Sequence, residues 1–113
     1  MPDPQLHHDS RCNRNPSRLG EGQTSDLLAE VKGWYVIGDR DRLVRDFSLN
    51  GFDQTVRLVN AVCDIARRED HHPQVMFDFK HIRVEFWTHT AGGVTRNDFI
   101  CAKQLNTWME NNT

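Results

Sequence analysis

Hydrophobic positions divide the chain into a polar beginning and a patterned remainder. Residues 1–23 hold three of the four prolines and almost no apolar side chains. A segment of this composition buries too little apolar surface to offset the entropy lost on ordering. We therefore expect a flexible N-terminal tail over residues 1–23 and one folded domain over residues 24–113.

The first part of the patterned region predicts a helix followed by two strands. Apolar residues at helical spacing begin after the Thr24–Ser25 pair, which is suited to cap a helix, and stop at Gly33. The apolar run 34–37 predicts a short strand. Residues 43–49 alternate between apolar and polar, as a second strand would, although Arg45 interrupts the alternation.

The longest helix is predicted over residues 52–68, with Asn50 as its cap. Pro73 prevents it from continuing through His72. Two adjacent apolar stripes run along it, and stripes of that combined width are typical of a helix buried on two sides. One stripe is Phe52, Val56, Val59, Cys63 and Ala66, and the other is Leu58, Val62 and Ile65.

The last third of the chain predicts a hairpin and a final helix. Residues 74–79 and 81–87 each alternate with one apolar face, and a tight turn separates them. Thr95 and Asp98 have the spacing of a capping box ahead of a helix over 96–109. The order α-β-β-α-β-β-α predicts an α+β fold in which three helices pack on one face of a four-stranded antiparallel sheet.

Composition argues against some classes of binding partner and favours one kind of cellular compartment. The formal net charge of −2 provides no basic surface for nucleic acid. No apolar run approaches the roughly 20 residues of a membrane span, and no signal segment opens the chain. The cysteines are odd in number and far apart (Cys12, Cys63 and Cys101), which favours a reducing compartment. We expect no nucleic-acid or membrane partner and a cytoplasmic location.

Three histidines and one carboxylate stand at the ends of predicted elements. His71 and His72 precede Pro73 after the long helix, His89 follows the last strand, and Asp98 opens the last helix. Element ends can converge in an antiparallel fold, and functional side chains collect there. Because an unperturbed imidazole titrates at about pH 6.5, such histidines can exchange protons at neutral pH.

Other interpretations of these residues compete with a proton-transfer site. A histidine beside a proline or at a strand end is often structural or simply exposed, and Asp98 could serve only as a cap. A zinc site is disfavoured because adjacent histidines seldom chelate one ion and no thiolate or carboxylate completes a standard ligand set. His81 is expected to be an exposed sheet residue, and Trp87 either a partner surface or a pocket wall.

One extended motif resembles that of the pterin-4a-carbinolamine dehydratase family. The family pattern is His-His-Pro, a β-hairpin, Thr-His, a glycine-containing loop and an Asp near a helix start. It corresponds here to His71-His72-Pro73, Thr88-His89, Gly92–Gly93 and Asp98, with the family's spacing throughout. The resemblance extends over about residues 24–109 and leaves the first 23 residues outside.

The resemblance implies a lyase that needs neither a cofactor nor a metal, acting on a pterin. The expected substrate is 4a-hydroxytetrahydrobiopterin, which an aromatic amino acid hydroxylase produces, and the products are quinonoid dihydrobiopterin and water. By carry-over from the motif, His71 and His89 would be the acid/base pair, His72 would hold the pterin and Asp98 would support the site. The implied substrate-binding residues also include Pro73, Thr88, Thr90 and Ala91.

The resemblance also has implications for assembly and for alternative roles. Relatives form dimers that pair into tetramers, so a homotetramer or a homodimer is expected. Some relatives act as a transcriptional coactivator or an assembly chaperone, which is the alternative to catalysis and would allow a nuclear location. The chain departs from the family at Arg67 (often Glu), Phe79 (often Tyr) and Lys80 (often Asn).

Overall fold

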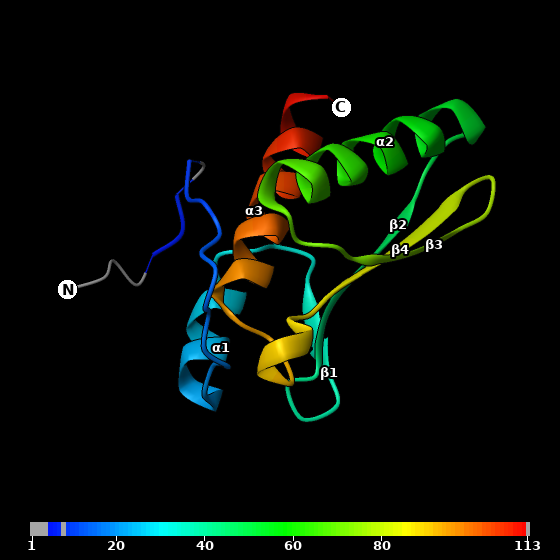
Figure 1. Cartoon of the computed structure of the whole chain (residues 1–113). Coiled ribbons are helices and arrows are strands. Elements are labelled where there is room, and N and C mark those ends of the chain that lie inside the picture. Colours follow the sequence, from blue (N-terminus) through cyan, green and yellow to red (C-terminus); the bar gives the residue numbers. More distant parts are fainter. Residues whose placement is uncertain (1–4, 8, 113) are drawn as a thin grey trace.

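The computed structural model describes residues 5–7 and 9–112, and its architecture confirms the predicted α+β fold (Figure 1). Three helices lie on one side of a four-stranded sheet with strand order β1-β2-β4-β3, and every neighbouring pair is antiparallel. A short 3₁₀ helix, η1, is added before α3. The elements are α1 Glu21–Leu28, β1 Tyr35–Ile37, β2 Arg42–Ser48, α2 Phe52–Glu69, β3 Gln74–Phe77, β4 His81–Phe86, η1 His89–Ala91 and α3 Arg96–Asn111.

The core lies between the two central strands and helices α2 and α3. Strand alternation directs every second side chain of β2 and β4 toward the helices. Burial of each large apolar side chain contributes about 1.5–3 kcal/mol relative to exposure. The core therefore fixes how the ends of α2, β4 and α3 lie relative to one another. It includes Leu43, Leu58, Val62, Ile65, Ile82, Val84, Phe86, Phe99, Ile100 and Leu105.

Arg45, which interrupts the apolar alternation of β2, is held at the edge of this core. Its guanidinium donates to Asn106 Oδ1 at 2.5 Å and to the Lys32 carbonyl at 3.3 Å. The same group lies 4.4 Å from the centroid of the Phe47 ring. Burial lowers the pKa of Arg45. The charged side chain can therefore face the core at this position, because oxygen atoms accept hydrogen bonds from its guanidinium.

The predicted start of α1 and the predicted cap of α2 are wrong. Helix α1 begins at Glu21, where Gln23 Oε1 accepts from the Gly20 amide at 3.0 Å, and Thr24 is already inside the helix and buried. Helix α2 starts at Phe52, as predicted, but its N-cap is Gly51, which has no side chain to cap the helix, and the Asn50 backbone amide donates to Gln54 Oε1. In both cases a glutamine three or four residues downstream satisfies the backbone amide at the helix start.

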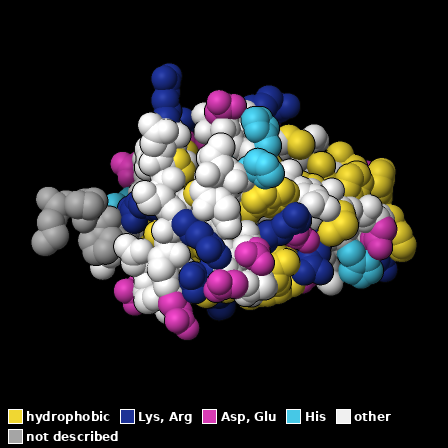
Figure 2. All heavy atoms as spheres, turned by 60° about the horizontal axis from the view of Figure 1, so that its bottom comes forward, with side chains coloured by type: hydrophobic (Ala, Val, Ile, Leu, Met, Phe, Trp, Pro, Cys, Tyr) yellow, Lys and Arg dark blue, Asp and Glu magenta, His cyan; other side chains and the backbone are white. Residues whose placement is uncertain are grey.

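One apolar stripe of α2 is covered by the chain itself, whereas the other is exposed at its N-terminal end. Leu58, Val62 and Ile65 are buried, whereas Phe52 is 55% exposed and Val56 is 36% exposed. The neighbouring β3 hairpin also presents apolar side chains, Met76, Phe77 and Phe79. Figure 2 shows hydrophobic side chains gathered at this end of the molecule. The result is an apolar surface, formed by Phe52, Val56, Met76, Phe77 and Phe79, that no element of the described chain covers.

The segment ahead of α1 runs beside α3 (Figure 1). Leu6 is 6% exposed and belongs to the core cluster, and its amide donates to Glu30 Oε1 at 2.9 Å. The predicted domain boundary at residue 24 therefore falls inside α1, and residues before it contact the domain. Whether residues 1–23 move as a flexible tail stays a prediction.

Candidate active site

The end of α2 directs His71 inward. Asp70 adopts a left-handed conformation, φ 50° and ψ 47°, which ends the helix. The amides of Asp70 and His71 both donate to the Ala66 carbonyl, a C-terminal capping arrangement that reverses the chain. Pro73 follows two residues later and excludes renewed helix. The turn separates the directions of His71 and His72, so that the His71 side chain is only 12% exposed and that of His72 is 75% exposed.

His71 is held by a buried carboxylate. Its Nε2 lies 2.5 Å from Asp98 Oδ1, and the Asp98 side chain is fully buried. The imidazole ring is also nearly parallel to the Phe86 ring, with the centroids 6.1 Å apart. A carboxylate accepting from Nε2–H fixes the tautomer in which Nδ1 carries the lone pair. His71 is therefore oriented before any ligand arrives.

Asp98 is itself held by the start of α3 and the end of β4. Its second oxygen, Oδ2, accepts from the Thr95 amide at 2.8 Å and from the Thr88 hydroxyl at 3.0 Å. The two threonine hydroxyls lie 2.7 Å apart. Thr95 also caps the helix by accepting from the Asn97 amide, which confirms the predicted capping box. One carboxylate thus caps a helix with one oxygen and orients a histidine with the other.

A cavity of about 940 Å³ opens beside His71. This volume lies within the range of small-molecule sites, roughly 300–1,000 Å³. Its walls come from the chain before α1, the end of α2, the end of β4, η1 and the start of α3. The lining residues are Cys12, Asn13, Arg14, Pro16, Glu69, Asp70, His71, His72, Trp87, Thr88, His89, Thr90 and Asn97.

The structure brings the three predicted histidines to this cavity. His72 and His89 are exposed at its rim, and His89 opens η1, whose last turn closes at Gly92 with φ 73°. Thr88 and Thr90 also line the cavity. Asp98 lies behind His71 and does not line it, and neither do Pro73 and Ala91, which are half-buried nearby.

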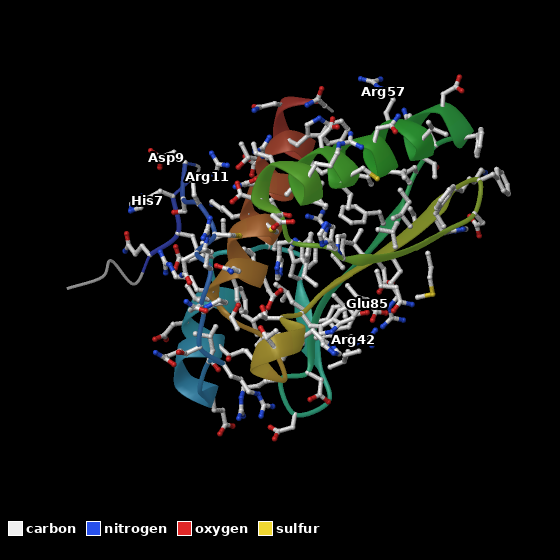
Figure 3. All side chains as sticks on the ribbon, in the orientation of Figure 1. His7, Asp9, Arg11, Arg42, Arg57 and Glu85 are labelled. Atoms are coloured by element: carbon white, nitrogen blue, oxygen red, sulfur yellow. The ribbon has the colours of Figure 1, made fainter. Side chains whose placement is uncertain are left out.

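Trp87, which directly follows β4, forms part of the cavity wall, one of the two alternatives that the sequence left open for it. The Arg42 guanidinium lies 3.9 Å from the centroid of the Trp87 ring. Glu85 Oε1 accepts from Arg42 at 2.7 Å and Gln74 Oε1 at 3.0 Å, which holds the cation in place. Figure 3 shows Arg42 and Glu85 pointing toward each other from neighbouring strands. A cation stacked on an aromatic ring contributes about 0.5–1 kcal/mol and restricts the ring.

Several lining residues were not predicted. Asn97 looks like an ordinary helix-start residue in the sequence, and Glu69 like one more solvated charge at the end of a helix. The residues Cys12, Asn13, Arg14 and Pro16 lie in the segment expected to be a tail. The sequence carries no pattern that would have identified them, because they reach the cavity through tertiary contacts alone.

The described residues hold no candidate metal cluster, and the three positions that depart from the family pattern lie outside the cavity lining. Within residues 5–7 and 9–112, no three His, Cys, Asp or Glu side chains are grouped so as to hold a metal ion. Arg67 is paired with Asp64 at 2.5 Å on the surface of α2. Phe79 and Lys80 lie exposed in the β3–β4 turn. None of the three is a lining residue.

Comparison with protein families identifies the family to which this chain belongs. The family model described as pterin 4 alpha carbinolamine dehydratase matches residues 17–108. The chain therefore belongs to the pterin-4a-carbinolamine dehydratase family, as the motif predicted.

Two bacterial relatives match nearly the whole chain. A protein of Nitrosospira multiformis is 38% identical over 99 residues, covering 88% of this chain and 86% of its own. One of Xylella fastidiosa is 35% identical over 106 residues, covering 94% and 90%. Both are provisionally named pterin-4-alpha-carbinolamine dehydratase.

Two solved structures share the fold. A transcriptional coactivator/pterin dehydratase from Brucella melitensis has a TM-score of 0.77 at 26% identity and covers 80% of this chain and 97% of its own. A pterin dehydratase-like protein identified as a RuBisCO assembly factor in the alpha-carboxysome has a TM-score of 0.56 at 15% identity, covering 91% and 94%, which shows the fold alone. Across the described residues, no helix has the length and hydropathy required to cross a membrane.

Proposed function

We propose that the protein is a dehydratase that converts 4a-hydroxytetrahydrobiopterin into quinonoid dihydrobiopterin and water. The supporting observation is the His71–Asp98 pair, oriented in advance beside a cavity that also collects His72 and His89. Family membership supports a pterin as the small-molecule substrate. The specific pterin and its link to an aromatic amino acid hydroxylase are parts of the proposal.

The proposed elimination balances without an external reactant. The C4a–O bond breaks and the leaving oxygen takes a proton to become water, while the N5–H bond breaks and a double bond forms between N5 and C4a. The step requires one acid and one base. It transfers no electrons and therefore needs no redox cofactor.

The histidines receive different roles in this proposal. His71, whose Nε2 is engaged by Asp98, presents Nδ1 for proton transfer, and His89 on the rim is its partner. Exposed His72 binds the pterin. Thr88 supports the Asp98 carboxylate, because its hydroxyl contacts Asp98 and Thr95. Its backbone is a proposed contact of the substrate. Pro73, Thr90 and Ala91 remain proposed substrate contacts by family resemblance.

The test is the rate of dehydration by wild type, His71→Ala and His89→Ala. We expect each variant to lose about 10²–10⁴-fold in kcat/KM, the contribution typical of a positioned acid or base. His81→Ala is the matched control, because His81 is exposed on β4 and bonds Asp78 outside the cavity. Circular dichroism checks the fold. Wild-type rates in both variants would contradict the assigned roles.

We also propose that the protein forms a homotetramer, or at least a homodimer. The apolar surface of Phe52, Val56, Met76, Phe77 and Phe79 supports this, since large exposed apolar patches mark interaction sites. Analytical ultracentrifugation should show a species at two or four times 13.2 kDa. Sedimentation as a monomer alone would contradict it. Co-purification of a transcription factor or another protein, without dehydratase activity, would favour a binding role on the same fold.

A further inference from the structure

The segment ahead of α1 is built into the cavity by two anchors. We call residues 9–18 the N-terminal arm. At its first anchor, Glu69 Oε1 accepts from the Cys12 amide at 2.9 Å, and Glu69 Oε2 is 2.5 Å from Arg11 Nε. Gln104 donates to the same Oε2 at 3.0 Å and to the Ser10 carbonyl at 3.2 Å. The Glu69 side chain is only 2% exposed, so the arm covers the carboxylate that holds it.

The second anchor is a reciprocal pair between Asn13 and Asn97. The Asn13 amide donates to Asn97 Oδ1 at 3.0 Å, and Asn97 Nδ2 donates to the Asn13 carbonyl at 2.8 Å. Both anchors adjoin the His71–Asp98 pair, because Glu69 precedes His71 by two residues and Asn97 directly precedes Asp98. The arm therefore spans the end of α2 and the start of α3, which hold the two partners of that pair.

The anchored arm places a cation at the cavity. Cys12, Asn13, Arg14 and Pro16 are lining residues, and Arg14 is the single Lys or Arg in the lining. The carboxylate of Glu69 is already engaged by Arg11, Gln104 and the Cys12 amide. Among the described residues, the Arg14 guanidinium makes no hydrogen bond or ion pair. Its donors are thus available to a molecule in the cavity.

We propose that the N-terminal arm is a substrate-binding wall in which Arg14 donates hydrogen bonds to the oxygen or nitrogen acceptors of the pterin. The planar guanidinium carries five donors in a fixed fork, which suits two neighbouring acceptors on a heteroaromatic ring. This inference rests on the proposed function and deepens it. Residues 9–16 precede the part of the chain that the family model matches, residues 17–108, so Arg14 is a contribution from outside that part.

The experiment compares Arg14→Ala and Arg14→Lys with wild type in two assays, steady-state dehydration and equilibrium binding of 7,8-dihydrobiopterin. Arg57→Ala is the matched control, since Arg57 lies on the exposed side of α2 far from the arm (Figure 3). We expect Arg14→Ala to raise KM and Kd by about tenfold or more, as for loss of a hydrogen bond to a charged group. kcat should stay within about twofold, and Arg14→Lys should fall between.

KM and Kd of Arg14→Ala within twofold of wild type would overturn the inference, as would an equal rise in Arg57→Ala. Because Arg14 is exposed, melting temperatures should match wild type and exclude misfolding as the cause. The binding assay reports on Arg14 even if wild type proves unable to dehydrate the substrate. If wild type does not dehydrate the substrate but Arg14→Ala still binds 7,8-dihydrobiopterin more weakly than wild type, the proposed role of the arm stands and the proposed lyase activity is refuted. The two proposals can therefore fail separately.

Discussion

The two sides of the cavity differ in how their histidines are held. His71 is 12% exposed and is fixed on a fully buried Asp98, which in turn is bonded to Thr88 and to the Thr95 amide. His72 is 75% exposed, and its nearest recorded charge partner is Asp70 at 3.8 Å. His89 is likewise exposed. One side is preorganised by a network of hydrogen bonds, whereas the histidines of the other side are exposed and have no comparable network among the described residues.

The largest expected difference is between the two adjacent histidines. His71→Gln should lower kcat/KM by about 10²–10⁴-fold, because it removes the oriented side chain that we propose as a proton carrier. His72→Gln should lower it by about tenfold or less, the value of one hydrogen bond to the ligand. Measuring kcat and KM of both variants in parallel compares two histidines that are adjacent in the sequence. Equal losses would show that burial and orientation do not distinguish the two roles.

A second difference should appear in stability. Asp98→Ala removes the acceptor of the Thr95 amide and of the Thr88 hydroxyl, and it leaves the buried start of α3 with only the Thr95 half of its capping box. We expect the free energy of unfolding to fall by about 2–4 kcal/mol.

Urea denaturation with His89→Ala as the control measures this effect. His89 is exposed and no hydrogen bond of its side chain is recorded among the described residues, so its removal should change stability by less than about 0.5 kcal/mol. A stable Asp98→Ala variant would mean that the carboxylate serves the histidine alone.

A smaller effect is expected from Thr88→Val, which keeps the shape of the side chain and removes its hydroxyl. The hydroxyl bonds both Asp98 and Thr95, so stability should fall by about 1–2 kcal/mol. Activity should fall with it, because Asp98 would be less well held. Thr90→Val at the exposed rim is the matched control for stability. Equal effects of the two substitutions would contradict a special role for the buried network.

The smallest expected effect concerns the pH dependence of the arm's anchor. Burial raises the pKa of Glu69, but the Cys12 amide, Gln104 and Arg11 together outweigh it and lower that pKa below its ordinary value. A carboxyl whose folded pKa is lowered contributes stability above its unfolded pKa and loses it as the pH falls through the folded pKa. Wild type should therefore exceed Glu69→Gln in stability at pH 7, with the difference shrinking below about pH 4.

Thermal unfolding of both proteins between pH 7 and pH 3 tests this sign. Arg68 Nε lies 3.7 Å from Glu69 and is common to both proteins. Asp64→Asn, an exposed carboxylate on the same helix, controls for the loss of one negative charge. A stability difference that grew as the pH fell would contradict the direction assigned to the Glu69 pKa.

Sequence reasoning reached the fold but misplaced some of its details. The alternation in β4 and the stripe of Leu58, Val62 and Ile65 were interpreted correctly, because burial follows the periods of strands and helices. Helix α1 does not start at Thr24 and the cap of α2 is not Asn50, since Gln23 and Gln54 accept from the backbone amides near these two helix starts. Local cap preferences are weak enough for a nearby side chain to override them.

By itself, the sequence determined the order of elements and the family, and it named His71, His72, His89 and Asp98 as candidate site residues, because periodicity and motif spacing are local properties of the chain. Only the tertiary structure decided that Asp98 holds His71, that Trp87 is a wall and that the arm reaches the cavity. These contacts join residues far apart in sequence, such as Asn13 and Asn97. Such contacts form only when the folded core sets the distance between the ends of α2 and α3.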